Sequence, residues 1–146
     1  MSRVVYTTQD QVKAKLPADF LLEALDDNRD GVIDDDVWTA VAEDAADQVD
    51  ARLGTRYATP FDPANMPPPA KAASLLFVLE TLYLRRGYGT EETNPFLVSA
   101  RAARADLLKI GQGEGQLSPT ATRPRPSVAV YSEPSRTTSS NGSLST

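Results

Sequence analysis

Apolar residues recur at helical spacing along the chain, and the most regular stretch runs from Asp36 to Arg56. Acidic residues fill the intervening positions and predict a solvated opposite face. Gly54 follows the last apolar position and favours a left-handed C-terminal cap. We therefore expect a long helix with the other helices packed around it. Its apolar members lie three or four positions apart, as on one helix face, and are Trp38, Val41, Ala42, Ala45, Val49 and Leu53.

Two shorter helices are predicted before this stretch. Thr8 and Gln11 have the spacing of a capping box, which predicts a short helix that continues towards Leu16. Pro17 interrupts this helix, because proline disfavours helical backbone at the residue before it. The same proline suits the first turn of a second short helix, residues 17–25.

The middle of the chain is rich in proline and then strongly apolar. Five prolines between residues 55 and 69 predict a loop without regular structure. Pro69 can start a helix from Ala70 to Arg86, which is apolar almost all round and is expected to be the central buried helix. Gly87 is expected to end it.

A final helix is predicted from the pair Asn94–Pro95, an N-cap followed by proline at the first helical position. We expect it to run to about Ile110. Three basic residues are expected to face outwards: Arg101, Arg104 and Lys109. One narrow apolar seam packs inwards, formed by Phe96, Ala100, Ala103, Leu107 and Ile110.

The composition changes at Pro119 to serine, threonine, proline and arginine, which is typical of a disordered tail. One island, Ser127 to Tyr131, alternates like a strand. We divide the chain into a helical domain, residues 1–118, and a C-terminal arm, residues 119–146. The predicted fold class is all-α, a bundle of about four to five helices with a long, mostly extended arm that lies along another chain or along its own domain.

Composition limits the chemistry. The chain contains neither cysteine nor histidine, which excludes disulfides, thiolate metal sites and any Ser–His or Cys–His mechanism within one chain. The net charge is −5, and the arm carries three arginines against one glutamate, so residues 1–118 carry −7. An acidic body argues against a nucleic-acid surface. No signal pattern or membrane span is recognised, and we expect a soluble protein made in a cytoplasm that needs no cofactor and is not an enzyme.

An aspartate-rich turn before the long helix resembles part of a calcium loop. A calcium loop has twelve residues and ends in a glutamate that binds calcium through both oxygens. Here the twelfth position is Val37, and the nearest carboxylate, Asp36, comes one residue before it. Aspartate, asparagine and glycine also favour ordinary turns, so a polar turn between helices is the competing interpretation. The candidate calcium ligands at positions 1, 3, 5 and 9 of the loop are Asp26, Asn28, Asp30 and Asp34, with a glycine at position 6.

Other polar patterns are interpreted structurally. The carboxylates on the long helix form a solvated face, although Asp50 could pair near the helix end with Arg52 or Arg56 and pin that end to the loop. The glycines from Gly111 to Gly115 follow a helix where a dinucleotide fingerprint needs a strand, so they predict a flexible hinge. In the body, the residues expected to set the shape of the fold are Trp38, Val49, Leu53, Arg56 and Tyr57.

The arm holds the residues predicted to bind a partner. Its arginines suit an acidic neighbour, such as the body of a second copy, and its alternating island suits strand addition. No metal site is expected apart from the candidate calcium loop. The predicted partner-binding residues are Arg123, Arg125, Val128, Val130, Tyr131 and Arg136.

Several short motifs occur along residues 5–118. They are Tyr6-Thr-Thr-Gln-Asp, the aspartate-rich turn, Val49-Asp-Ala-Arg-Leu-Gly-Thr-Arg-Tyr57 followed by Pro60, Leu82-Tyr-Leu-Arg-Arg, and Leu108-Lys-Ile-Gly-Gln-Gly followed by Leu117. The most specific pattern among them is I-D-x-x-L-x-x-R-Y-x-x-P, met here with Val49 in place of isoleucine. Together these motifs resemble the small helical proteins of the Mu-type phage virion-morphogenesis module and, more broadly, the head–tail connector or adaptor class of tailed phages. The arm is not part of this pattern.

The resemblance implies a structural virion protein at the head–tail interface. Proteins of this class form a ring, commonly of twelve copies, between the portal protein and a tail-side connector or terminator protein. The ring extends the DNA channel, and DNA only passes through it. An acidic body suits a channel wall, because like charge keeps DNA from adhering. Two alternatives stay open, namely a tail-terminator or tail-completion protein and a calcium-dependent interaction module.

Overall fold

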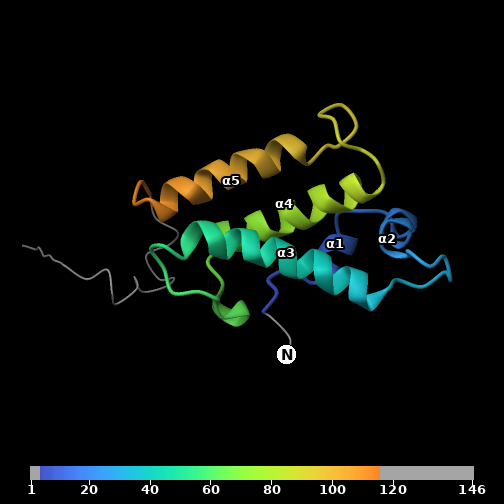
Figure 1. The fold of residues 1–146 in the computed structure, drawn as a ribbon, viewed down its shortest axis with the longest axis horizontal. Helices are drawn as coiled ribbons and strands as arrows, with labels where there is room; N and C mark the ends of the chain where they lie inside the picture. Colours follow the sequence, from blue (N-terminus) through green and yellow to red (C-terminus); the bar gives the residue numbers. More distant parts are fainter. Residues whose placement is uncertain (1–3, 116–146) are drawn as a thin grey trace, which may run out of the picture.

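The computed structural model describes residues 4–115, which form α-helices and one short 3₁₀ helix, with no β-strand in this range (Figure 1). The predicted all-α bundle is confirmed. Residues 116–146, which include the whole predicted arm, lie outside the described residues. The elements are α1 (Gln9–Lys13), α2 (Ala18–Leu25), α3 (Asp35–Leu53), η1 (Pro63–Asn65), α4 (Pro68–Arg85) and α5 (Leu97–Gly111).

Three long helices build the body, and α4 is the central one, as expected. It packs against α3 and α5 and also contacts α1 and α2. In Figure 1, α4 runs antiparallel to both α3 and α5, so the C-terminal ends of α3 and α5 lie at the same end of the molecule. The short helices α1 and α2 lie beside the other end of α4. This arrangement brings residues near 53 and near 111 together although they are far apart in sequence.

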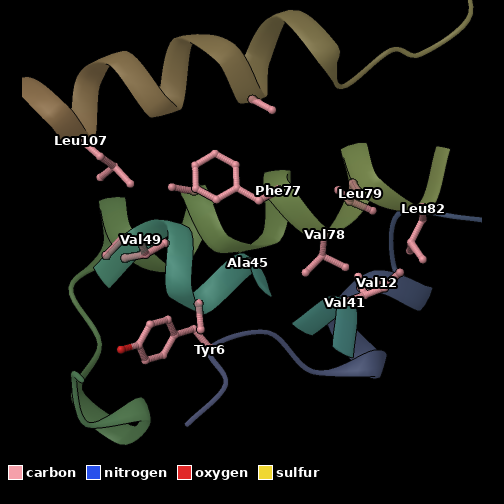
Figure 2. Packing of buried hydrophobic residues seen from close by; sticks show 14 of the residues in the cluster. Tyr6, Val12, Val41, Ala45, Val49, Phe77, Val78, Leu79, Leu82 and Leu107 are labelled. Carbon is pink, nitrogen blue, oxygen red and sulfur yellow. The ribbon is translucent and has the colours of Figure 1, made fainter. Parts of the chain in front are cut away.

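The core forms where the apolar faces of these helices meet. Figure 2 shows Phe77 of α4 pointing towards α5 and Leu107, whereas Val78 points the other way, towards Val41 and Val12. The predicted inward face of α3 is buried except at Trp38, which is partly buried at the edge of the core. Most of the stability of such helices comes from this tertiary burial rather than from helix propensity.

Local capping signals account for several helix ends. Thr8 and Gln11 form the predicted capping box at α1, with each side chain accepting a hydrogen bond from the other residue's backbone N–H. Gly87 has a positive φ of 88° after α4. The Tyr88 N–H donates to the Tyr83 carbonyl at 3.0 Å, which closes a Schellman-type end.

Three expectations about helix ends need correction. Gly54 is not a left-handed cap, because its φ is −65° and the chain continues winding in a turn that joins the Tyr57 N–H to the Leu53 carbonyl. The proline-rich loop is not entirely irregular, because the Asp62 side chain caps η1. Asn94 does accept a hydrogen bond from the Phe96 N–H, but Pro95 and Phe96 form a turn and α5 begins at Leu97.

Candidate functional site

The aspartate-rich turn between α2 and α3 is a closed loop held by its own side chains. The Asp26 carboxylate accepts hydrogen bonds from the backbone N–H groups of Asp30 (3.1 Å) and Gly31 (2.8 Å). Asn28 also accepts from the Asp30 N–H, at 3.1 Å. Gly31 has a φ of 84°, the left-handed conformation that glycine adopts most readily. The backbone therefore follows the sharp turn that the sequence pattern predicted.

The same turn brings together the three carboxylates among the predicted calcium ligands. Asp26, Asp30 and Asp34 each offer an oxygen within 4.8 Å of the others. Partial burial acts to raise the pKa of Asp26, but the N–H groups of Gly31 and Asp30 stabilise the carboxylate and lower that pKa overall. These N–H donors thus stabilise the negative charge of Asp26. Val37, at the position of the missing glutamate, packs partly buried against the core.

The turn is also tied to the body. Asp34 accepts a hydrogen bond from the Asp27 N–H at 2.8 Å, so its side chain closes the turn and does not cap α3. Arg85 of α4 donates to the Ala24 carbonyl at 2.8 Å and pairs with the Asp27 carboxylate. Contacts with α2, α3 and α4 thus position the turn together.

A buried ion pair joins the three long helices, and sequence reasoning missed it. Glu80 of α4 is only 4% exposed, and both its carboxylate oxygens accept hydrogen bonds from Arg104 of α5. Arg104 also donates to the Gln48 side chain of α3 at 2.9 Å and lies over the Phe77 ring. The expectation that Arg104 faces solvent is wrong. The sequence clue to this ion pair was Glu80, because it is a carboxylate within an otherwise apolar run. A buried carboxylate needs a cationic partner.

Tyr6 forms a second buried polar link, between the N-terminal segment, α3 and the proline-rich loop. Its hydroxyl donates to Asp50 at 2.7 Å and accepts from the Phe61 N–H at 2.9 Å. Burial and the neighbouring carboxylate raise the pKa of Tyr6 above its ordinary value. Asp50 therefore helps to tie α3 to the loop through the Tyr6 hydroxyl, whereas the expected partner was Arg52 or Arg56.

The C-terminal ends of α3 and α5 are locked together. Arg56 donates to the Ile110 carbonyl at 3.0 Å and to the Gly115 carbonyl, and Thr55 donates to the Gly111 carbonyl at 3.1 Å. Gly111 lies so close to the Arg52 carbonyl that a Cβ atom there would overlap it. The prediction of a flexible hinge is therefore wrong at Gly111, which is a packed helical residue.

The predicted partner-binding residues of the arm lie outside the described residues. Of the body residues expected to shape the fold, Val49, Leu53 and Tyr57 are buried. Arg56 joins the C-terminal ends of α3 and α5 through its hydrogen bond to the Ile110 carbonyl. In the part of the chain that the structure describes, no helix is both long and apolar enough to cross a membrane. The polar contacts described above connect helices to one another and to the loops between them.

Residues 6–131 match the sequence model of the family described as bacteriophage Mu, Gp36. The match extends beyond the expected limit near residue 118 and includes the alternating island of the arm up to Tyr131. No curated protein and no solved structure matches the chain.

Proposed function

The chain belongs to the bacteriophage Mu Gp36 family, and from this premise we propose that it is a head–tail connector, or adaptor, subunit. Copies of the chain form a ring, of twelve in the expected case, between the portal protein and the tail-side connector or terminator protein. The ring extends the DNA channel, and the protein acts at the head–tail interface of the virion as a structural component, not as an enzyme. The observation that carries this proposal is the family match over residues 6–131.

Charge supports the same role. The body carries −7, which disfavours adhesion of DNA to a channel wall. The arm is basic and contains an apolar island, a combination that suits docking onto an acidic protein surface. The buried links among α3, α4 and α5 favour a rigid ring subunit, because a docking surface has to keep its shape.

The decisive experiment removes the protein from a phage that encodes it. An amber codon replaces an early codon of the gene, and lysates from suppressor and non-suppressor hosts are compared by electron microscopy. A connector is needed to join heads to tails, so we expect non-suppressor lysates to contain tailless heads and free tails of normal length. Complementation with the plasmid-encoded chain should restore joined particles.

The alternatives give different particles. A tail-terminator protein controls the end of tail growth, so its loss should give abnormally long tails. Joined, normal particles without the protein would exclude the connector role. A matched complementing chain truncated after Ser118 tests the arm: failure to join particles supports an arm that binds the portal or a neighbouring copy, and normal joining moves these contacts to the helical body.

The calcium-dependent interaction module is the second candidate, and the grouping of Asp26, Asp30 and Asp34 within 4.8 Å is the observation that favours it. Calorimetric titration with calcium, using Asp26→Asn as the matched control, separates it from the connector role. Heat that disappears in the variant would favour the module. No heat and an unchanged melting temperature would exclude it.

A further inference from the structure

A shallow groove between the N-terminal half of α3 and the C-terminal half of α4 has the character of a peptide-binding surface. Its volume is about 360 Å³, and Val37, Ala40 and Val41 provide its apolar floor. This volume is at the small end of the range for ligand sites, and it matches one or two side chains rather than a cofactor. The groove belongs to neither the acidic turn nor the buried ion pair.

Carboxylates line the α3 side of the groove without cationic partners. Asp36 and Asp44 lie two helical turns apart on the same face as Ala40, and both are exposed. Within residues 4–115, neither forms a salt bridge, although Asp44 accepts a hydrogen bond from Gln48. Arg85 lines the α4 side, but Asp27 and the Ala24 carbonyl already bind its guanidinium group. The groove therefore offers an apolar floor and uncompensated negative charge.

One segment of this chain has the complementary chemistry. Arg123 and Arg125 precede Val128 and Val130 in the sequence, and the two valines, two positions apart, would share one side of the segment if it were extended. Arginine side chains suit the carboxylates, and small branched side chains suit the floor of valine and alanine. Arg136 and Glu133 follow further along the arm.

The arm is long enough to reach the groove of its own chain. Gly115 is held by Arg56 at the C-terminal end of α3. Asp44 lies nine residues before Leu53, about 14 Å along the helix. Ten residues separate Gly115 from Arg125 and span up to about 33 Å when extended. A tether of this length gives the arm a high effective concentration at the groove of its own chain.

We propose that residues 123–131 of the arm dock into this groove on their own chain, with the arginines beside Asp44 and the valines against Val37 and Ala40. The free subunit then holds its partner-binding segment against its own body and releases it when a partner competes. This inference goes beyond the connector role and does not depend on it, because it concerns the purified protein alone.

Disulfide trapping tests the proposal in the full chain, which has no natural cysteine. The double variant Ala40→Cys/Val128→Cys is oxidised at low concentration and analysed on a non-reducing gel. The matched control is Ser99→Cys/Val128→Cys. Ser99 is exposed and lies twelve residues before the end of α5, whereas Ala40 lies thirteen residues before the end of α3. An arm with no preferred binding site on the body should reach the two positions with similar frequency.

We expect the Ala40 pair to form an intramolecular disulfide at least about tenfold faster than the Ser99 pair, as a directed contact implies. Arg125→Glu should slow trapping at Ala40, and adding Asp44→Arg should restore it. Equal rates for the two pairs would overturn the proposal, as would cross-linking that occurs only between chains. Neither result would affect the particle-assembly experiment, so the two proposals fail independently.

Discussion

Replacing Gly111 with alanine tests whether the close approach of α3 and α5 is required by the fold. Helix propensity alone predicts a gain, because alanine is favoured over glycine in a helix by roughly 1 kcal/mol. Packing predicts a loss. A Cβ atom at Gly111 would overlap the Arg52 carbonyl oxygen and would lie 3.1 Å from the Arg52 carbonyl carbon and 3.4 Å from the Thr55 Oγ1 atom.

The magnitude follows from what can move. The atoms that a Cβ would meet first belong to the α3 backbone and not to the tip of a flexible side chain. Relief therefore requires the ends of two helices to separate, which strains the hydrogen bonds from Thr55 to Gly111 and from Arg56 to Ile110. Overpacking of this kind costs about 3 kcal/mol, the upper part of the usual range. After the gain in helix propensity is subtracted, we expect Gly111→Ala to lower the free energy of unfolding by about 2 kcal/mol.

The assay is thermal and urea unfolding of the full chain, followed by helical circular dichroism. A loss of about 2 kcal/mol should lower the melting temperature by about 8 °C in a domain of this size. Gly89→Ala is the control, because its added Cβ would meet only the Leu84 side chain, at 3.7 Å. A Gly111→Ala protein as stable as the parent chain, or more stable, would refute the packing argument.

Three further predictions test the buried links and the acidic turn. Arg104→Met should cost about 3 kcal/mol of unfolding free energy, because it leaves the buried Glu80 carboxylate unpaired, and adding Glu80→Leu should recover part of the loss in urea unfolding. Tyr6→Phe should cost about 1–2 kcal/mol, because Asp50 and the Phe61 N–H lose their partner; urea unfolding measures this. Asp26→Ala should lower the melting temperature at pH 7, because the N–H groups of Asp30 and Gly31 lose their acceptor, with scanning calorimetry as the measurement.

The pH dependence provides the controls for two of these changes. The pKa of Tyr6 is higher in the folded protein than in the unfolded chain, where it is about 10. Its contribution to the free energy of unfolding is therefore complete below about pH 10 and is lost as the pH rises further. The Tyr6→Phe protein should lack this part of the alkaline loss. The pKa of Asp26 is lower in the folded protein than in the unfolded chain. Its contribution to the free energy of unfolding is therefore present above about pH 4 and is lost at more acidic pH. A difference between parent and Asp26→Ala that persists unchanged at pH 2 would contradict this.

Much of the fold was predictable because its signals are local. The apolar faces of α3 and α4 depend on spacing within one helix, and the Thr8 capping box depends on residues three positions apart. The turn with Gly31 at positive φ was also predictable, since aspartate, asparagine and glycine favour that geometry by themselves. These features need no knowledge of the rest of the chain.

The errors at Arg104 and Gly111 came from contacts between distant segments. Arg104 lies beside the inward seam of α5, and its direction depends on Glu80 and Gln48, which are contributed by two other helices. Gly111 looked like a flexible hinge because nothing in the local sequence reveals that the Arg52 carbonyl lies against it. Both residues could be placed only once the packing of α3, α4 and α5 was known.

The arginine–tyrosine part of the family-like motif now has a physical explanation. Tyr57 is buried, and the guanidinium group of Arg56 lies 5.2 Å from the centre of its ring while donating to carbonyls at the end of α5 and at Gly115. The motif therefore joins two helix ends and also fixes the point from which the chain continues towards the arm. That point lies at the C-terminal ends of α3 and α5, so any contact that the arm makes elsewhere on the body has to be reached from there.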